Sequence, residues 1–142
     1  MLPEEFTMRP RVLIADDHRA VTELLRSLLE DSYDVVGIVT DGRQLLEQAP
    51  KLMPDVVVLD VSMPLLNGME AAEQLKPLLP SLKFVFITMN HDPSLAEAAL
   101  TLGPVGYVLK SAAAKELTMA VSNVLHGKPY LTSGLRPRKT FE

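Results

Sequence analysis

A short apolar run in the middle of the chain places the strongest constraint on the fold. Residues 56–59 are three valines and a leucine, and they lead directly into Asp60 and a loop that contains Pro64. A run of this length, rich in β-branched residues, is typical of a strand buried on both faces of a parallel sheet. Ligands and reactive groups of such sheets gather just beyond the carboxyl ends of the strands. Asp60 is therefore the first candidate for a functional residue.

The rest of the chain alternates runs of this kind with helical patterns. The predicted strands are residues 11–15, 35–39, 56–59, 83–87 and 106–109. After each strand, apolar residues recur at steps of three and four, which predicts a helix with one buried face; Leu24 and Ala98 are among the residues predicted to face inward. Helix N-caps are predicted at Asp41, Asn67, Asp92 and Ser111. This alternation predicts an α/β fold, a doubly wound five-stranded parallel sheet with helices on both faces.

The length of the chain, 142 residues, suits one domain with a single core. We expect residues 1–10 to form a leader and residues 11–127 to form the domain. Residues 128–142 are predicted to be a linker, because they combine prolines, glycines and basic residues without any periodicity.

Composition narrows the possible partners. The formal charge of -4 and the aromatic content of 5% give the domain neither the positive surface nor the stacking rings that nucleic acid binding requires. The chain has no cysteine, and no apolar run approaches the roughly 18 residues of a membrane-spanning helix. We therefore expect a cytoplasmic protein without a membrane partner.

Polar residues stand at the carboxyl ends of four predicted strands, namely Asp16 and Asp17, Asp60, Thr88, and Lys110. Each alone has a structural explanation, such as capping the next helix or meeting solvent. Because parallel strands end at the same edge of a sheet, we expect these side chains to lie together. Complementary polar groups gathered at one edge favour a functional site over five separate structural roles.

This set of side chains suits phosphoryl transfer to a carboxylate. Three clustered carboxylates repel one another and call for a hard divalent cation, and oxygen ligands favour Mg2+. The predicted nucleophile is Asp60, which would form an acyl phosphate. Lys110 would supply positive charge to one phosphoryl oxygen, and the Thr88 hydroxyl would donate a hydrogen bond to another.

The same residues make the chain resemble the receiver domain of two-component response regulators. The resemblance covers residues 9–130 and is carried by Asp16-Asp17, by Leu59-Asp60-Val61-Ser62-Met63-Pro64 with Asn67-Gly68, by Ile87-Thr88 and by Gly106-Tyr107-Val108-Leu109-Lys110. It implies a flavodoxin-like (CheY-like) sheet with strand order 2-1-3-4-5. It also implies phosphorylation of Asp60 by a sensor histidine kinase, and no enzyme activity beyond self-catalysed phosphorylation and dephosphorylation.

The resemblance further implies the roles of individual residues. The implied Mg2+ ligands are Asp17 and Asp60 directly, Asp16 mostly through water, and the backbone carbonyl of Ser62. Phosphorylation would draw Thr88 towards the phosphoryl group, and Tyr107 would turn into the vacated space. The surface around the fourth and fifth helices would change as a result.

Local sequence is most similar to the branch of receivers with a LuxR-type helix-turn-helix output domain, in residues 88–92, 106–111 and 126–133. That resemblance implies control of transcription through a C-terminal DNA-binding domain that is absent from this chain. It also implies a homodimer that forms on phosphorylation. DNA would be a partner only through the missing domain.

Three other functions stay open. The chain could be a stand-alone receiver, or a phosphate-independent module that docks a partner protein, although the complete set of polar strand ends argues against the second. A magnesium-dependent phosphatase with an aspartyl-phosphate intermediate is the third possibility. Such enzymes carry an Asp-x-Asp motif followed by Thr, in which the second Asp is a general acid. Two residues after Asp60 the chain has Ser62 instead, which argues against this possibility.

The three histidines are expected to take no part in the chemistry. His18, His91 and His126 lie at predicted helix edges, without a cysteine or a paired spacing, so no zinc site is predicted. A phosphorylated histidine is expected on the partner kinase instead.

Overall fold

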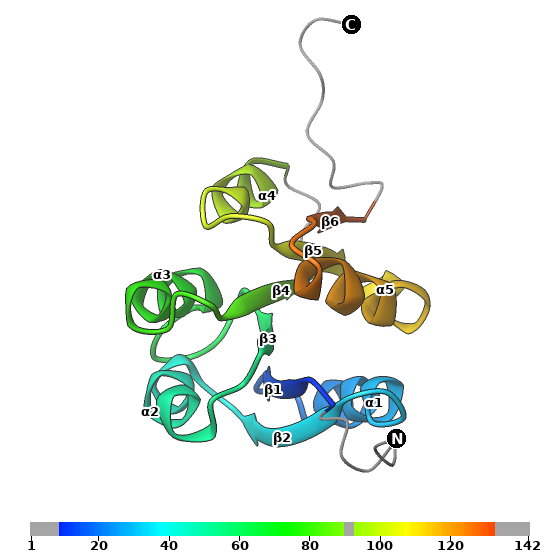
Figure 1. Ribbon diagram of the computed structural model, residues 1–142, viewed down its shortest axis with the longest axis horizontal. Helices are drawn as coiled ribbons and strands as arrows, with labels where there is room; N and C mark the ends of the chain where they lie inside the picture. Colours follow the sequence, from blue (N-terminus) through cyan, green and yellow to red (C-terminus); the bar gives the residue numbers. More distant parts are fainter. Residues whose placement is uncertain (1–8, 90–92, 133–142) are drawn as a thin grey trace, which may run out of the picture.

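The computed structural model describes residues 9–89 and 93–132 and shows a central parallel sheet flanked by helices (Figure 1). Its strands are β1 (Arg11–Ala15), β2 (Asp34–Val39), β3 (Val56–Asp60), β4 (Lys83–Thr88), β5 (Gly106–Leu109) and β6 (Tyr130–Leu131). The order is β2-β1-β3-β4-β5-β6, and every neighbouring pair is parallel. The predicted α/β class and the order 2-1-3-4-5 are confirmed. The predicted number of five strands is one too few.

The described residues also form α1 (Arg19–Leu29), α2 (Gly42–Leu52), α3 (Gly68–Leu78), α4 (Pro93–Leu100) and α5 (Ala113–Leu125). Figure 1 shows α2, α3 and α4 on one side of the sheet and α1 and α5 on the other, as a doubly wound fold requires. Among these helices, none has the length and apolar character needed to cross a membrane.

Some predictions fall on residues that the structure does not describe. The predicted cap Asp92, His91, and residues 1–8 and 133–142 of the predicted leader and linker lie outside the described residues. The last two residues of the predicted leader are described and contact the fold. Arg9 donates a hydrogen bond to the Glu30 carbonyl at 2.9 Å, and the Pro10 carbonyl accepts one from the Asp34 N–H at 2.9 Å.

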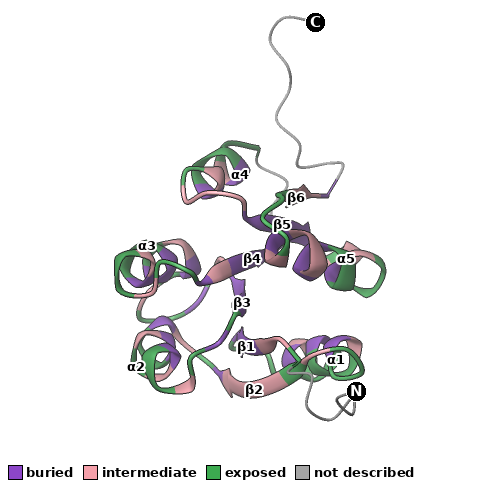
Figure 2. Cartoon of the chain, in the orientation of Figure 1, coloured by how far each residue is buried: buried purple, intermediate pink, exposed green. Residues whose placement is uncertain are grey.

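Strand β3 lies at the centre of the sheet and is buried along its whole length (Figure 2). Val57 and Leu59 belong to the core beneath α2, α3 and α4, whereas Val56 and Val58 belong to the core beneath α1 and α5. A strand between two helical layers needs apolar side chains on both faces, which explains the uninterrupted apolar run. Asp60, the last residue of β3, is therefore held on a rigid element.

Local capping explains where two of the helices begin. The Asp41 carboxylate accepts a hydrogen bond from the Gln44 N–H at 2.8 Å, and Asn67 forms a capping box with Glu70, so both predicted caps are confirmed. The predicted cap at Ser111 is wrong. The chain leaves β5 through a single 3-10 turn, Lys110–Ala112, which places Ser111 inside the turn instead of ahead of the helix.

Two predicted inward-facing residues point outward. Leu24 is 44% exposed, and the buried positions of α1 are Thr22, Leu25 and Leu29. In α4 Ala98 is exposed, and Ala96 is buried instead. Leucine and alanine occupy several sides of these helices, so apolar spacing alone did not fix which stripe faces the sheet.

Strand β6 lies within the segment predicted to be a linker. Tyr130 and Leu131 pair with Gly106 and Tyr107 of β5, and the N–H of the next residue, Thr132, donates to the Tyr107 carbonyl at 3.0 Å. The start of the predicted linker, through Thr132, is thus part of the folded domain. A strand of two residues carries no periodicity that a sequence pattern could reveal.

Thr132 fastens this strand to the domain through its hydroxyl. The side chain is buried, accepts a hydrogen bond from the Leu109 N–H at 3.2 Å, and donates one to Glu116 Oε1 at 2.8 Å. Thr132→Val should destabilise the domain by ~1–3 kcal/mol, because it leaves the buried Leu109 N–H without its partner. Urea unfolding followed by circular dichroism measures the change. Thr132→Ser keeps the hydroxyl and serves as the control; equal stability of the Val variant would refute the role of the hydroxyl.

Candidate functional site

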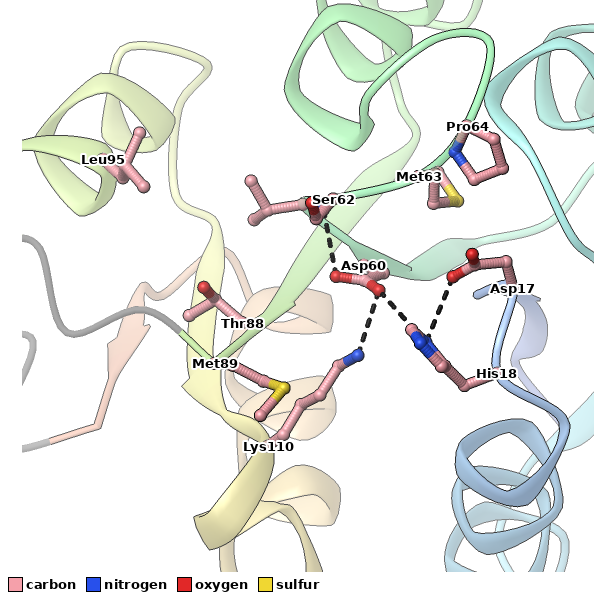
Figure 3. Close-up of a pocket in the computed structure, with 11 residues that line it drawn as sticks. Asp17, His18, Asp60, Ser62, Met63, Pro64, Thr88, Met89, Leu95 and Lys110 are labelled. Carbon is pink, nitrogen blue, oxygen red and sulfur yellow. Dashed lines mark hydrogen bonds and ion pairs between the residues drawn. The ribbon is translucent and has the colours of Figure 1, made fainter.

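The predicted polar residues meet at the carboxyl end of the sheet (Figure 3). Asp16 follows β1 directly, Asp60 and Thr88 end β3 and β4, and Lys110 follows β5. Asp16, Asp60 and Thr88 are at most 3% exposed. The side chain of Asp17 is more open, at 34% exposure. The expectation that these side chains share one edge of the sheet is therefore met.

Asp60 is held at both of its carboxylate oxygens. Its Oδ1 accepts a hydrogen bond from the Ser62 N–H at 3.0 Å, and its Oδ2 lies 3.0 Å from Lys110 Nζ. The same ammonium lies 3.4 Å from Asp16 Oδ2. Lys110 thus balances the charges of two buried carboxylates, Asp60 and Asp16. The Ser62 N–H, from the loop after β3, orients the Asp60 carboxylate.

Burial, hydrogen bonds and neighbouring charges shift the pKa values of Asp60 and Lys110. Burial raises the pKa of Asp60, although the hydrogen bonds from the Ser62 N–H and from Lys110 act in the opposite direction. Burial also acts to lower the pKa of Lys110, but the hydrogen bond and charge of Asp60, together with Asp16, outweigh it, so the pKa is raised. Lys110 is consequently held in its charged form beside a carboxylate of increased basicity.

His18, which the sequence did not predict to take part, also lies in this group. Its Nδ1 is 3.1 Å from Asp16 Oδ1, 3.1 Å from Asp17 Oδ1 and 4.0 Å from Asp60 Oδ2. His18 stands at the N-cap of α1, as its predicted place at a helix edge requires, but its contacts with the acidic group were not predicted. Its position directly after the acidic pair was the available signal, because a residue at the end of β1 cannot lie far from the edge where the carboxylates gather.

The donor atoms suit a divalent metal ion. Ligand atoms of Asp16, Asp17, His18 and Asp60 all lie within 4.8 Å of one another. Asp16 Oδ2 is buried and makes no hydrogen bond, with the Lys110 ammonium at 3.4 Å as its ion-pair partner. A buried carboxylate oxygen without a hydrogen bond, amid further carboxylates, is what a cation would satisfy.

A cavity of about 980 Å3 opens in front of Asp60. Thr88 lines it beside Lys110, and Met89, which is 78% exposed, lies at its edge (Figure 3). Tyr107, on the neighbouring strand, is fully buried, and its ring centroid lies 6.0 Å from that of Phe86. Asp60 lines this cavity although the residue itself is almost fully buried, so the cavity is the route by which a group carried by another molecule would reach it.

The comparison with protein families agrees with this geometry. The model of the response regulator receiver domain matches residues 12–122, which include every polar residue of the site. The chain belongs to the response regulator receiver family. Several solved response regulators and receiver domains share its fold closely. A LuxR-family two-component response regulator of Aurantimonas sp. has a TM-score of 0.84 and 29% identity, with 89% of this chain and 92% of that chain covered.

Other relatives include transcriptional regulatory proteins and response regulators. LnrK of Bacillus subtilis, a transcriptional regulatory protein, is 36% identical over 119 residues, which are 82% of this chain and 54% of the relative. The response regulator GacA of Pseudomonas viridiflava is 36% identical over 124 residues, or 86% of this chain and 58% of the relative. The isolated receiver domain of RcsB from Salmonella enterica, solved with the phosphomimetic BeF3-, has a TM-score of 0.81 and 33% identity, with 89% and 96% of the two chains covered. The receiver described here spans somewhat more than half the length of these two curated regulators.

Proposed function

We propose that this receiver accepts a phosphoryl group on Asp60 from a phosphohistidine of a sensor kinase. The observation that carries the proposal is the position of Asp60, which faces an open cavity while Lys110 and the Asp16–Asp17 pair lie around it. In the reaction, an Asp60 oxygen attacks phosphorus and the bond from phosphorus to the donor's imidazole nitrogen breaks. The receiver's own catalysis is limited to this transfer and to the later hydrolysis of the acyl phosphate.

The contacts of Asp60 support a division of roles. The Ser62 N–H fixes Oδ1 and so sets the orientation of the carboxylate for in-line attack. The Lys110 ammonium, which contacts Asp60, is close enough to form an ion pair with an incoming phosphoryl oxygen, where negative charge develops. Thr88 would donate a hydrogen bond to another phosphoryl oxygen, which its position on the neighbouring strand and in the lining of the same cavity supports.

The same proposal includes a Mg2+ ion. Asp17, Asp60 and the backbone carbonyl of Ser62 would hold it directly, and Asp16 would hold it through water. When bound, the ion neutralises charge on the phosphoryl oxygens and reduces repulsion among the carboxylates. The compact set of carboxylate donors and the buried Asp16 Oδ2 support this assignment.

Thr88 is proposed to report phosphorylation to the surface of the domain, together with Tyr107. Thr88→Ala should still accept phosphate but lose most of the conformational response, because no hydroxyl is left to follow the phosphoryl group. Amide chemical shifts of residues 93–109, recorded with and without acetyl phosphate and Mg2+, measure the response. Thr101→Ala is the control, since that hydroxyl donates only to the Ala98 carbonyl on an exposed turn. An undiminished response in Thr88→Ala would remove Thr88 from the switch.

The output is proposed to be transcription, through a LuxR-type helix-turn-helix domain outside this chain. The support comes from relatives, which include transcriptional regulatory proteins and RcsB, whose structures include a complex with DNA. Dimers of RcsB have been solved on DNA, and we extend a phosphorylation-dependent homodimer to this protein. Sedimentation with and without BeF3- tests the dimer, and a monomer under both conditions would contradict it.

The decisive test of the proposed function is the intact mass after incubation with acetyl phosphate and Mg2+, repeated with a cognate kinase. The gain of one phosphoryl group supports the proposal. Failure to gain one from either donor would favour a receiver that docks a partner without phosphate.

A further inference from the structure

The ring of His18 occupies the middle of the acidic group (Figure 3). The residue is the N-cap of α1, and its backbone is fixed there. Its N–H donates to Asp16 Oδ1 at 2.8 Å, and its carbonyl accepts from the N–H groups of Val21 and Thr22. With the backbone anchored, the ring can reach the carboxylates while its side chain keeps 60% exposure. The ring is therefore free to serve as a ligand without disturbing the core.

The distances from His18 Nδ1 to the carboxylate oxygens fall in the range found between ligands of one octahedral ion. Ligands about 2.1 Å from such an ion lie about 3.0 Å apart when adjacent and about 4.2 Å apart when opposite. His18 Nδ1 lies 3.1 Å from one oxygen of Asp16 and from one of Asp17, and 4.0 Å from one of Asp60. His18 Nδ1 is thus close enough to share one cation with Asp17 and Asp60, the two carboxylates proposed above as direct ligands.

From this spacing we infer that His18 is a metal ligand, and that its imidazole makes the site prefer a first-row transition-metal dication such as Mn2+ over Mg2+. The inference rests on the proposed function, because it concerns the same metal position. Oxygen donors suit Mg2+ and Mn2+ alike, whereas an added imidazole nitrogen raises the affinity for a transition-metal dication relative to that for Mg2+. The neutral ring offers the lone pair of Nδ1 and carries its proton on the other nitrogen.

A purely structural role makes a different prediction. In that case His18 donates hydrogen bonds to the carboxylates of Asp16 and Asp17, and its loss would alter the affinities for Mg2+ and Mn2+ by the same factor. A ligand role changes their ratio. It also places a histidine nitrogen in contact with the bound ion, which a structural role does not.

The experiment compares the wild-type chain of 142 residues with the His18→Asn variant and with the control variant His126→Asn. The control histidine lies at the end of α5, where its Nδ1 is 2.7 Å from the Ser122 carbonyl. Calorimetric titrations with Mg2+ and with Mn2+ give the ratio of the Mn2+ affinity to the Mg2+ affinity. This ratio should fall about tenfold in His18→Asn and stay unchanged in His126→Asn. Electron spin-echo spectra of bound Mn2+, with 15N-labelled histidine, should show a coupled ring nitrogen in the wild type and in His126→Asn only.

The outcomes separate this inference from the proposed function. An unchanged affinity ratio in His18→Asn, or wild-type spectra without a coupled histidine nitrogen, would overturn the inference even if Asp60 takes up phosphate with Mg2+. Phosphate uptake measured by mass on the same three proteins reports on the proposed function alone. If the wild type bound neither cation, the inference and the Mg2+ assignment would both fall.

Discussion

Asp60→Asn should abolish the uptake of phosphate from acetyl phosphate and Mg2+ while the domain stays folded. An amide oxygen does not attack phosphorus to give a stable phosphoryl adduct, whereas the Asn side chain can still accept the hydrogen bond from the Ser62 N–H that Asp60 Oδ1 accepts now. The measurement is the intact mass after incubation, and the expected gain for the variant is zero. A phosphoryl group on the variant would mean that another residue is the acceptor.

The stability of the same variant follows from the pKa of Asp60. Because burial raises that pKa in the folded state, Asp60 favours folding below its ordinary pKa and loses this contribution as the pH rises through the raised value. At pH 7 the ionised carboxylate therefore opposes folding. Lys110 keeps Asp16 as a partner at 3.4 Å when Asp60 is replaced. We expect Asp60→Asn to be at least as stable as the wild type at pH 7, with a difference that shrinks as the pH is lowered.

A second aspartate near the same strand provides the matched control. Asp55 precedes β3 at its opposite end, where its Oδ2 accepts a hydrogen bond from the Arg11 N–H at 2.7 Å. Asp55→Asn should take up phosphate as the wild type does. Loss of uptake in both variants would point to damage of β3 instead of loss of a nucleophile.

The sheet and most of the site could be predicted because they rest on strong local signals. The apolar run before Asp60 is short and rich in valine, which favours a strand buried on both faces, and the helix between successive strands favours parallel pairing. Parallel pairing then brings the residues after each strand together, so Asp16 and Lys110 meet although 94 positions separate them (110 minus 16). Topology, not proximity in sequence, built this part of the site.

The features that were missed depend on contacts without a pattern. Strand β6 has two residues and is held by the edge of β5 and by the buried hydroxyl of Thr132. His18 is one side chain whose importance lies in its direction, which the fixed backbone of the α1 cap determines. Neither periodicity nor composition encodes such contacts, so they had to be seen in three dimensions.

Gly68→Ala should destabilise the domain by ~3 kcal/mol or more, although no side chain would be removed. Gly68 is the first residue of α3, and its N–H donates to the Val61 carbonyl at 2.8 Å. A Cβ at this position would lie 2.2 Å from the Asp60 carbonyl oxygen and 3.1 Å from Val61 Cα. These are backbone atoms at the end of the central strand, and Val61 is itself tied to β4 through the Ile87 carbonyl at 3.1 Å. They cannot give way without moving the sheet edge.

Urea unfolding measures this loss, with Gly127→Ala as the comparison. Gly127 has a φ of 77°, and a Cβ added there would meet no atom within 4 Å, so its replacement carries only the conformational cost of a left-handed residue, about 1 kcal/mol. The excess loss in Gly68→Ala over Gly127→Ala is then the cost of the clash. Equal losses in the two variants would show that the loop after β3 relaxes freely.

The clash has a chemical consequence wherever Gly68→Ala remains folded. The atom displaced most directly is the Asp60 carbonyl oxygen, so the new methyl group must move the residue that carries the nucleophile. Attack on phosphorus depends on sub-ångström alignment. Without denaturant, the folded variant should therefore take up phosphate at least tenfold more slowly than the wild type. Gly127→Ala should react at the wild-type rate. A folded Gly68→Ala variant that reacts at the wild-type rate would show that the position of Asp60 is set by Ser62 and Lys110 alone, without the close approach of α3.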